Sequence, residues 1–338
     1  MEKFLEVKNL RVSYHSYAGE VQSVRGVSFS IDAGQSVAIV GESGCGKSAL
    51  CKSIMKLLPK TAKIKSGKIL VNGADITDYT EKNMSRLRGE LFSMVFQDPM
   101  TSLNPTITVG KQIGEAVRIH NKKMSRGQIR KRVIELMQLV EIDRPEERIR
   151  QYPHEFSGGM RQRAVMAIAL AGNPKILFAD EPTTALDVTI QAQILDLLRE
   201  IQKKLGTATV FVTHDLGVVA RIADRVAVMY AGKIVEIGTV DEIFYDPRHP
   251  YTWGLLRSIP AFSRGKESLP SIPGMPPSLL HPPKGDAFAS RNAYALEIDF
   301  EEEPPMFRVT DSHYAATWLL DERAPKVVPP IGGNTDGT

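Results

Sequence analysis

Residues 36–50, "SVAIVGESGCGKSAL", decide the fold of this chain. The run "SVAIV" is apolar enough for a strand buried on both faces, glycine-rich "GESGCGKS" follows it, and the residues after that have helical spacing. Strand, loop and helix in this order fit the phosphate-binding pattern G-x-x-x-x-G-K-[ST]. A glycine-rich turn with no ligand leaves the lysine unexplained. We therefore predict a nucleotide site in a protein of the α/β class.

Each residue type in this loop has a chemical reason to be there. Glycines let successive backbone N–H groups turn inward toward an anion at the start of a helix. Lys47 reaches the outer phosphates, and the Ser48 hydroxyl is placed for a magnesium ion. The nucleotide contacts predicted from the loop are Gly41, Glu42, Ser43, Gly44, Cys45, Gly46, Lys47, Ser48 and Ala49.

The composition of the 338 residues is that of a soluble globular protein, with 42% hydrophobic and 24% charged residues. The 43 basic and 39 acidic residues nearly cancel, so we expect no general affinity for nucleic acid. The sequence has neither a run of about 18 apolar residues nor a signal peptide, which predicts a cytoplasmic location and no membrane span. Cys45 and Cys51, the only cysteines, suit neither a disulfide framework nor a metal site.

Further strands and helices extend the pattern along the chain. "KILFAD", residues 175–180, and "ATVFVTH", residues 208–214, flank a predicted helix, which indicates a parallel sheet. "RVAVMYAGKIVEIG" predicts a hairpin that turns at Ala231 and Gly232. The region from Val109 to Ile142 is typical of a helical subdomain, in which Ser125 caps a helix with an apolar face of Ile129, Val133, Ile134, Met137 and Val140.

A basic run, Lys122–Arg132, lies in this helical region. It is either a solvated helix face or a contact surface for a charged partner. Beyond about residue 245 the chain becomes proline-rich and is expected to have low regularity.

Asp180 and Glu181 stand at the end of a buried strand. Two acids in this place are costly unless a cation or a water molecule uses them. Asp180 suits magnesium, and Glu181 would polarise the water that attacks a phosphate. The alternative is an acidic turn that opens the next helix, because the following "PTT" holds a proline and two threonines that can cap it.

Three further residues give weaker signals. Gln97 in "VFQDP" and His214 in "FVTHD" lie at or just after strand ends, where such residues are more often solvated or bonded locally than catalytic. Tyr14 ends an early strand and could stack on adenine, or could pack in the core.

A second candidate anion site is "FSGGM", residues 156–160. Ser157 can cap the helix that follows, and Gly158 and Gly159 leave its first N–H groups uncovered. A capped helix with flexible glycines is the alternative. The segment lies far downstream of Lys47, and one small ligand rarely needs two phosphate sites on the same chain.

These motifs, in this order, resemble the Walker A loop, Q-loop, signature, Walker B with D-loop, and switch histidine of ABC ATPases. The resemblance implies a P-loop fold with a parallel-sheet core, an antiparallel β subdomain and a helical subdomain. It also implies ATP and Mg²⁺ as cofactors, and head-to-tail pairing in which Ser157, Gly158 and Gly159 contact the partner's ATP. Gln97 would then sense the phosphate and Mg²⁺ and link to a membrane subunit, Asp187 would lie at the dimer contact, and His214 would hold the γ-phosphate side. The signature departs from the commonest form, "LSGGQ", at Phe156 and Met160.

A narrower resemblance covers nearly the whole chain. The segments "FQDPMTSLNP", "QYPHEFSGGMRQR", "DEPTTALDVTIQAQILDLL", "THDLGVVA", "DPRHPYTWGLL" and "IPGMPPSL" are similar to the ATPase subunits of bacterial oligopeptide and dipeptide permeases. This implies a subunit on the cytoplasmic face of the membrane that drives peptide import. Its partners would be a second ATPase of different sequence, two transmembrane permease subunits and, indirectly, an extracytoplasmic peptide-binding protein.

The same resemblance implies the domain boundaries. An ATPase domain would span residues 1–245, with the helical subdomain at about 100–170. A C-terminal extension would follow at 246–330, and residues 331–338 would form a disordered tail.

The extension departs from the family in one respect. Many relatives carry four cysteines there, in a pattern like G-C-x-F-x-x-R-C that is associated with an iron–sulfur cluster. Here "GDAFASRN" has Asp286 and Asn292 instead, and no cysteine follows Cys51. We therefore expect no cluster with thiolate ligands. Packing of four aromatic residues is expected to replace it: Phe288, Tyr294, Phe300 and Trp318.

Three alternatives differ in how well they fit. The same machinery could import nickel or another small solute, because related permeases share much of this sequence. A soluble ABC ATPase of DNA maintenance or translation would carry long coiled-coil insertions or two ATPase domains, and neither is seen. A P-loop kinase would lack the signature helix followed by "DEPTTALD".

Overall fold

The structure is a computed structural model that describes residues 3–96, 102–183, 186–259 and 271–330. The chain forms two compact units and passes from one to the other after residues 4, 30, 36, 77 and 212. The first unit contains the chain up to residue 4 and residues 31–36 and 78–212, and the second contains 5–30, 37–77 and the chain from 213 onward. Among the described residues, no helix is both long and apolar enough to cross a bilayer.

The first unit contains a parallel arrangement of β6 (Phe92–Val95), β7 (Ile176–Asp180) and β8 (Ala208–Thr213). Every residue of β7 is buried, which explains the apolar run Ile176–Ala179 that precedes Asp180. The helix α8 (Val188–Leu205) connects β7 to β8. The predicted strand–helix–strand unit with parallel strands is therefore confirmed.

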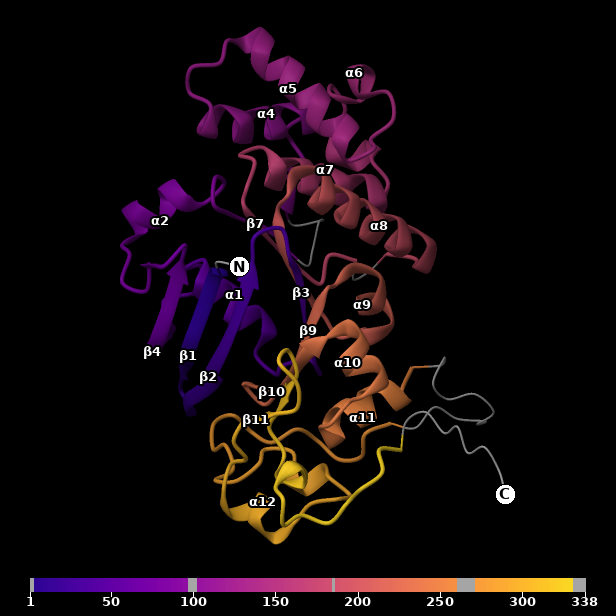
Figure 1. Ribbon diagram of the computed structural model, residues 1–338. Coiled ribbons are helices and arrows are strands. Elements are labelled where there is room, and N and C mark those ends of the chain that lie inside the picture. Colours follow the sequence, from indigo (N-terminus) through magenta and orange to yellow (C-terminus); the bar gives the residue numbers. More distant parts are fainter. Residues whose placement is uncertain (1–2, 97–101, 184–185, 260–270, 331–338) are drawn as a thin grey trace, which may run out of the picture. The chain divides into compact units, whose positions relative to one another are not determined.

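The other helices of the first unit lie between residues 81 and 170. In Figure 1, α4, α5 and α6 group together, and α7 and α8 lie nearer to β7. Ser125 caps α5 as predicted, because its hydroxyl accepts the Gln128 N–H while the Gln128 side chain accepts the Ser125 N–H. The bounds are α2 Glu81–Leu87, α4 Val109–His120, α5 Arg126–Leu139, α6 Pro145–Arg148, the short 3₁₀ turn η1 Pro153–Glu155, and α7 Gly158–Leu170.

The second unit contains two sets of strands. An antiparallel sheet has the order β2-β1-β4-β5, with β1 at Lys3–Ser16, β2 at Gly19–Asp32, β4 at Ala62–Val71 and β5 at Ala74–Asp75. The other set places β3 (Ser36–Val40) parallel to β9 (Arg225–Tyr230), which pairs antiparallel with β10 (Lys233–Thr239). The turn between β9 and β10 falls at Ala231 and Gly232, where φ is positive, so the predicted hairpin is confirmed.

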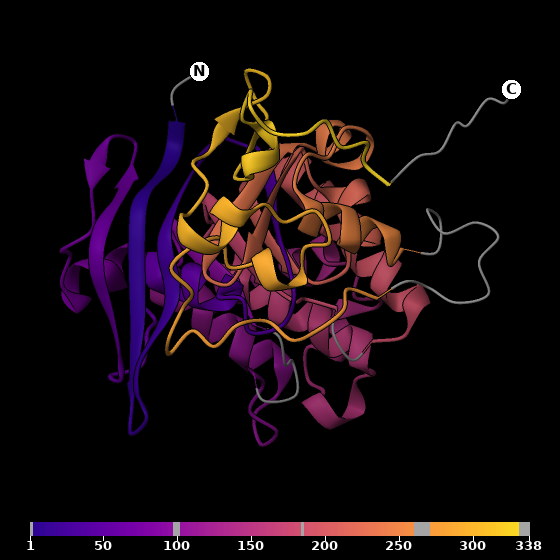
Figure 2. The same ribbon diagram turned by 90° about the horizontal axis from the view of Figure 1, so that it is seen from below.

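The extension adds short elements to this unit. Figure 2 shows it, orange to yellow, as loops joined by brief helices and strands. Its two short strands continue the set of β10, because β12 pairs with β10 and β11 pairs with β12. The helix α10 (Val240–Tyr245) precedes the extension. The bounds within it are α11 Pro250–Arg257, η3 Ala289–Arg291, α12 Glu297–Glu301, β11 Phe307–Arg308, β12 Tyr314–Ala315 and η4 Trp318–Leu320.

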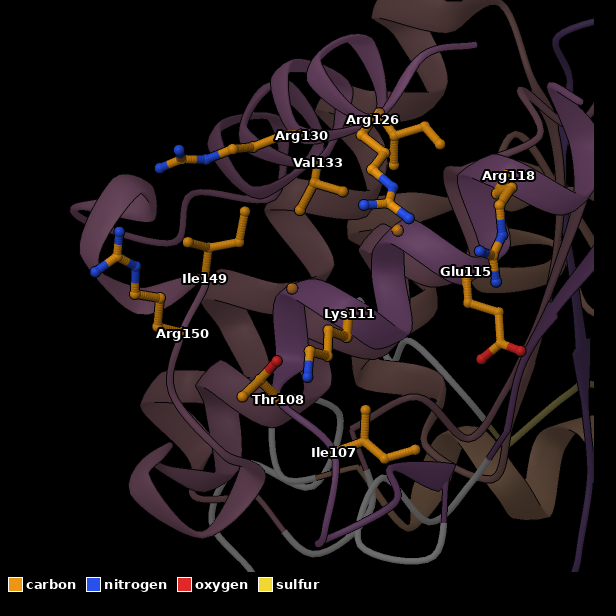
Figure 3. Close-up of a pocket in the computed structure, with 13 residues that line it drawn as sticks. Ile107, Thr108, Lys111, Glu115, Arg118, Arg126, Arg130, Val133, Ile149 and Arg150 are labelled. Carbon is orange, nitrogen blue, oxygen red and sulfur yellow. The ribbon is translucent and has the colours of Figure 1, made fainter. Parts of the chain in front are cut away.

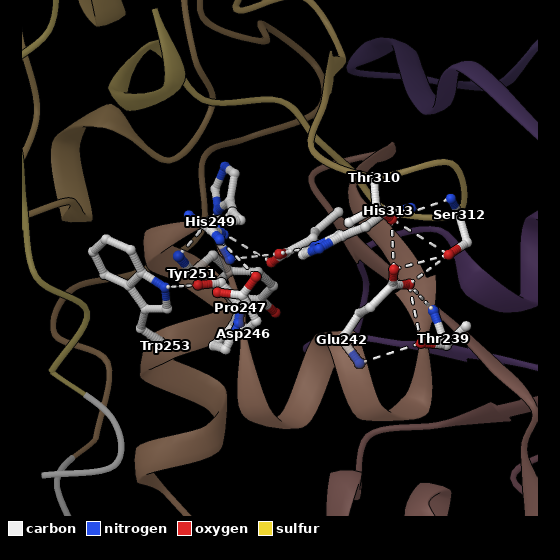
Figure 4. A network of polar contacts seen from close by, with 12 residues as sticks. Thr239, Glu242, Asp246, Pro247, His249, Tyr251, Trp253, Thr310, Ser312 and His313 are labelled. Atoms are coloured by element: carbon white, nitrogen blue, oxygen red, sulfur yellow. Dashed lines mark hydrogen bonds and ion pairs between the residues drawn. The ribbon is translucent and has the colours of Figure 1, made fainter. Parts of the chain in front are cut away.

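A buried polar network joins the extension to β10 (Figure 4). The Glu236 carboxylate is fully buried and lies 2.7 Å from the His313 ring. It also accepts the backbone N–H groups of Arg248, at 2.6 Å, and His249, at 3.1 Å. A buried carboxylate needs several donors to offset its lost hydration. The Glu236 side chain therefore joins β10 to two parts of the extension, the start of α11 and the segment at His313.

Two neighbouring groups in this network have shifted pKa values. Burial lowers the pKa of His249 to about 3, so its ring is neutral and Nδ1 accepts the Tyr251 N–H at the start of α11. Burial raises the pKa of Glu242, but hydrogen bonds from Thr310, Ser312 and Thr239 lower it to about 2. Glu242 therefore stays ionised and gives the extension a second attachment, next to the β10–α10 junction.

The aromatic packing predicted for the extension is partly wrong. Phe288 is buried, with its ring 5.3 Å from both Tyr230 and Tyr251, and Tyr294 packs edge-on against Trp253. Trp318 contacts the ring of Phe307. The Phe300 side chain, in contrast, is 59% exposed. The inward residue of the short helix α12 is Asp299, which is buried and whose carboxylate accepts the Leu296 N–H.

The loop between β3 and α1 (Lys47–Ile54) is pressed against other backbone of the second unit. A Cβ on Gly46 would lie 2.1 Å from the Ser23 carbonyl oxygen, and one on Gly41 would lie 2.0 Å from that of Met229. Both glycines have positive φ, as does Gly44, but a Cβ on Gly44 would meet nothing within 4 Å. Gly41 and Gly46 thus allow close packing, and Gly44 faces open space.

This difference predicts opposite outcomes for two single substitutions. Gly46→Ala should lower the free energy of unfolding by about 2 kcal/mol or more, because the new methyl group meets the backbone of β2 and Ala is disfavoured at positive φ. Gly44→Ala, the matched control, should lower the free energy of unfolding by only about 1 kcal/mol, because the only cost is that of Ala in a left-handed backbone conformation. Urea denaturation of the nucleotide-free protein measures both values. Equal losses in the two variants would contradict the close packing at Gly46.

Candidate functional site

The phosphate loop of the second unit holds a buried ammonium group. Lys47, the first residue of α1, is 5% exposed. Its Nζ donates to the carbonyl oxygens of Gly41, at 2.7 Å, and Glu42, at 2.9 Å. These acceptors carry no net charge, so they orient the ammonium group without neutralising it. An anion bound within the loop would therefore be attracted by the positive charge of Lys47.

The surroundings of Lys47 suit a phosphate group. The N–H groups at the start of a helix, here α1, point out of its N-terminus, toward a ligand bound in the preceding loop. Ser43 and Gly44 are exposed, and the space beside Gly44 is open. A concave loop at a helix N-terminus with a lysine is a phosphate site by its chemistry. Because Gly41 and Gly46 fit against β9 and β2, this shape is set by the fold.

Glu42, the second residue of the loop, is held from several sides. Its carboxylate receives two hydrogen bonds from the guanidinium group of Arg291, at 2.7 and 2.9 Å. Its backbone N–H donates to the hydroxyl of Tyr251, at 2.8 Å. The sequence interpretation missed both partners, because nothing in it links residues so far apart. The only trace of Arg291 was the arginine in the family pattern G-C-x-F-x-x-R-C.

Two other predicted nucleotide contacts lie in the second unit. Tyr14 is half-buried in β1 opposite Ala62, and burial raises its pKa. His214 is exposed directly after β8, where the next residue, Asp215, caps α9 (Leu216–Ile222) by accepting the Gly217 N–H. The stacking role of Tyr14 and the phosphate role of His214 stay predictions.

The acidic pair of the first unit does not open the following helix. Asp180 is the last residue of β7 and is buried, and the N-cap of α8 is Asp187, whose carboxylate accepts the Ile190 N–H at 3.0 Å. Glu181 has φ of 46°, and its N–H donates to the Val212 carbonyl at 2.9 Å. A left-handed backbone at a residue other than glycine costs about 1 kcal/mol and is common at functional sites. The alternative of an acidic helix start is therefore wrong.

The predicted second anion site also lies in the first unit. Ser157 caps α7 by accepting the Met160 N–H at 3.3 Å, as predicted. Ser157 and Gly158 are exposed, which leaves this helix N-terminus open. Gly159 is buried instead, since a Cβ there would lie 2.7 Å from the Ile190 side chain. Gly158 thus keeps the helix start accessible, and Gly159 lets α7 pack closely against α8.

The two units divide the predicted site between them. The first unit holds Ser157, Gly158, Gly159, Asp180, Glu181 and Asp187, and the second holds Tyr14, His214 and the loop from Gly41 to Ala49. Gln97 lies outside the described residues. Within the ranges that the structure describes, no three His, Cys, Asp or Glu side chains form a metal cluster. The predicted magnesium ligands Ser48 and Asp180 belong to different units.

A groove of about 680 Å³ lies between α4 and α5 in the first unit (Figure 3). Its lining joins an apolar floor to a basic rim, and Arg126 and Arg130 of the rim belong to the basic run Lys122–Arg132. Both arginines are exposed, and the role of this run as a contact surface stays a prediction. The floor includes Ile107, Ile129, Val133 and Ile149, and the charged residues are Lys111, Glu115, Arg118, Arg126, Arg130 and Arg150.

Comparison with known proteins agrees with this geometry. Residues 24–184 match the family described as ABC transporter, and residues 235–298 match the oligopeptide/dipeptide transporter C-terminal region. The chain is 62% identical over 330 residues to the oligopeptide transport ATP-binding protein OppD of Bacillus subtilis (strain 168), covering 97% of this chain and 92% of the relative. It is 60% identical over 328 residues to the dipeptide transport ATP-binding protein DppD of Lactococcus lactis subsp. cremoris (strain MG1363), covering 97% and 94%.

Solved structures show the same fold. A dimeric post-hydrolysis state of the ATP-binding cassette MJ0796, bound to ADP and Pi, superposes with a TM-score of 0.62 at 28% identity. The match covers 70% of this chain and 98% of that one. The predicted α/β P-loop fold and the ATPase activity that goes with it are confirmed. The chain belongs to the ABC transporter ATPases, in the branch defined by the C-terminal region of oligopeptide and dipeptide transporters.

Proposed function

We propose that this chain is the subunit that binds and hydrolyses ATP in an importer of oligopeptides or dipeptides. The observation that carries the proposal is the phosphate loop, in which Lys47 is oriented by two carbonyl oxygens and Gly44 faces open space. The two relatives named above, which align over nearly their whole length, are peptide transport ATP-binding proteins. The C-terminal match supports the same substrate class.

The roles within the site follow from the chemistry of phosphoryl transfer. Lys47 and the N–H groups at the start of α1 would bind the phosphates, and Tyr14 would stack on the adenine. A magnesium ion, whose binding neutralises phosphate charge, would be held by Ser48, Gln97 and Asp180. Glu181 would accept a proton from the attacking water, with Gln97 and His214 beside the γ-phosphate. Such sites work mainly through placement and electrostatics.

Replacement of the general base tests this assignment. Glu181→Gln keeps the size of the side chain but removes its basicity, so ATP hydrolysis by the assembled transporter should fall at least about 100-fold. ATP affinity, measured by calorimetry on the purified chain, should stay within about twofold of the unmodified protein. Glu200→Gln, an exposed change on α8, is the matched control. Normal turnover by Glu181→Gln would remove this residue from the catalytic role.

The open N-terminus of α7 supports a shared site. We propose that the subunit pairs head to tail with a second ATPase of different sequence, so that Ser157, Gly158 and Gly159 contact the ATP bound by the partner, with Asp187 at the contact. Ser157 and Gly158 are exposed, which leaves the start of α7 accessible to a ligand bound by a partner. The solved relative MJ0796 is described as dimeric.

A bulky cation at the helix start tests the pairing. Ser157→Arg should abolish ATP-dependent association with the partner ATPase, because the side chain occupies the space of the phosphates and the cap of α7 is lost. ATP binding by this chain alone should be unchanged. Gln138→Arg, on the exposed side of α5, is the control for added charge. Analytical ultracentrifugation with and without ATP would show the loss, and unaltered association would exclude the shared site.

The groove between α4 and α5 suggests how the chain meets a membrane subunit. We propose that it receives a segment of a transmembrane permease subunit that carries acidic and apolar side chains, which places this chain at the cytoplasmic face of the membrane. Five basic residues and one acidic residue line the groove around an apolar floor. That combination favours an acidic amphipathic partner over a neutral one.

Charge reversal in the groove tests the partner surface. The double variant Arg126→Glu, Arg130→Glu should weaken association with the permease subunits about tenfold or more, while ATP binding by the isolated chain is retained. Lys131→Glu lies on the same helix but outside the groove and is the matched control. Co-purification from detergent-solubilised membranes measures the association. Equal recovery of permease subunits with both variants would place the contact elsewhere.

The transported solute contacts other subunits of such a transporter. An importer of nickel or another small solute is the second candidate, because related permeases share much of this sequence. The intact complex, purified with its binding protein, should show ATP hydrolysis stimulated by peptides. Stimulation by a metal ion and not by peptides would assign the second function.

A further inference from the structure

We propose that the C-terminal extension sets the conformation of the phosphate loop, and that Arg291 is a positioning residue which acts on the loop through Glu42. The inference rests on the proposed role of residues 41–48 as the ATP site. Arg291 and Glu42 are 249 residues apart in the chain but form a two-bonded ion pair. All the residues concerned belong to the second unit.

Arg291 is a rigid anchor. Its side chain is 4% exposed, and its three nitrogen atoms donate to four partners. Two bonds reach Glu42, one reaches the Tyr230 hydroxyl at 3.1 Å, and two reach the carbonyl oxygens of Pro273 and Ile272 at 2.8 and 3.4 Å. The guanidinium group also lies over the rings of Tyr230 and Phe288. A guanidinium fork held in this way fixes the direction of the carboxylate that it binds.

The segment that presents Arg291 is itself held by polar side chains. Asp286 and Asn292 close local turns, because their side chains accept the N–H groups of Phe288, at 3.0 Å, and Tyr294, at 2.9 Å. Burial raises the pKa of Asp286 to about 6. These two residues stand where the family pattern has cysteines. Local hydrogen bonds therefore hold the arginine between them in place.

Glu42 transmits this anchoring to the phosphate-binding lysine. Its carboxylate is bound by Arg291, its N–H is bound by the Tyr251 hydroxyl, and its carbonyl oxygen accepts from Lys47 Nζ. Because these contacts fix the Glu42 carbonyl group, they also fix the Lys47 ammonium group that donates to it. Without Arg291, the Glu42 carboxylate would be freed beside the phosphates and would repel them. Both effects lower the affinity for ATP.

A second connection runs through Glu303 of the extension. Its carboxylate accepts from Arg25 at 2.8 Å, and Arg25 donates from its backbone and side chain to the β9–β10 turn, at Gly232 and Ala231. The Gly232 N–H then donates to the carbonyl of Cys45 in the phosphate loop, at 2.9 Å. The extension thus reaches the loop at two positions, Glu42 and Cys45.

ATP affinity of the purified full-length chain, measured by calorimetry with Mg²⁺, tests the positioning role. Arg291→Ala should raise the Kd for ATP about tenfold, and Arg291→Lys, which keeps the charge but not the two-bonded geometry, about threefold. Arg323→Ala, an exposed arginine of the extension bonded to Asp321, should leave the Kd unchanged. In the assembled transporter the KM for ATP should rise with Arg291→Ala while kcat stays within about twofold.

A double-mutant cycle separates this role from general stabilisation. If Arg291 acts through Glu42, then Arg291→Ala combined with Glu42→Gln should bind ATP no more weakly than the weaker single variant. A double variant whose Kd rises by the product of the two single effects would overturn the inference. So would a Kd for Arg291→Ala equal to that of Arg323→Ala. Should Arg291→Ala fail to fold, Arg291→Lys and its combination with Glu42→Gln give the same comparison.

Lys47→Ala distinguishes failure of the proposed function from failure of this inference. Loss of ATP binding in Lys47→Ala with normal binding in Arg291→Ala would reject only the positioning role. Normal ATP binding in Lys47→Ala would reject the site itself, and the positioning role with it.

Discussion

The close packing of backbone against backbone at Gly41 and Gly46 is the constraint on which the rest of the site depends. Neither position has space for a β-carbon, because the carbonyl oxygens of Met229 and Ser23 already occupy it. The loop therefore takes its shape from β9 and β2. Lys47 is turned inward as a result, and α1 starts beside the same concave space. A change in either strand would move the phosphate site.

The extension is integrated with the second unit through polar contacts as much as through apolar ones. Glu236 binds His313 and two backbone N–H groups, and Glu242 binds Thr310 and Ser312. A buried carboxylate such as that of Glu236 demands all of its partners at once, because a buried group left without a partner costs about 1–3 kcal/mol. A proline-rich segment with few regular elements thereby acquires one conformation. The contacts of the phosphate loop with Tyr251 and Arg291 are part of the same arrangement.

Local chemistry in the sequence was enough to predict the strands, the loop and the helix caps. The G-x-x-x-x-G-K-[ST] pattern, the Ser125 and Ser157 caps and the hairpin at Ala231 each depend on neighbouring residues only. Phe300 was predicted wrongly, because which face of a five-residue helix turns inward depends on its tertiary partners. Arg291 was missed for the same reason. Its partner Glu42 lies 249 residues away, and no periodicity connects the two.

That separation has a consequence for how the protein is made. The loop from Gly41 to Ser48 leaves the ribosome early, but the arginine that holds its second residue follows 249 residues later. At roughly 5–20 residues per second, this interval lasts on the order of tens of seconds. The strand β9, which pairs with β3 just before the loop, is also synthesised late, since it begins at Arg225. A nascent chain interrupted before the extension therefore carries the nucleotide motif together with β2 and β9, but not the Arg291 contact to Glu42, so full affinity for the ligand is reached only when synthesis is nearly finished.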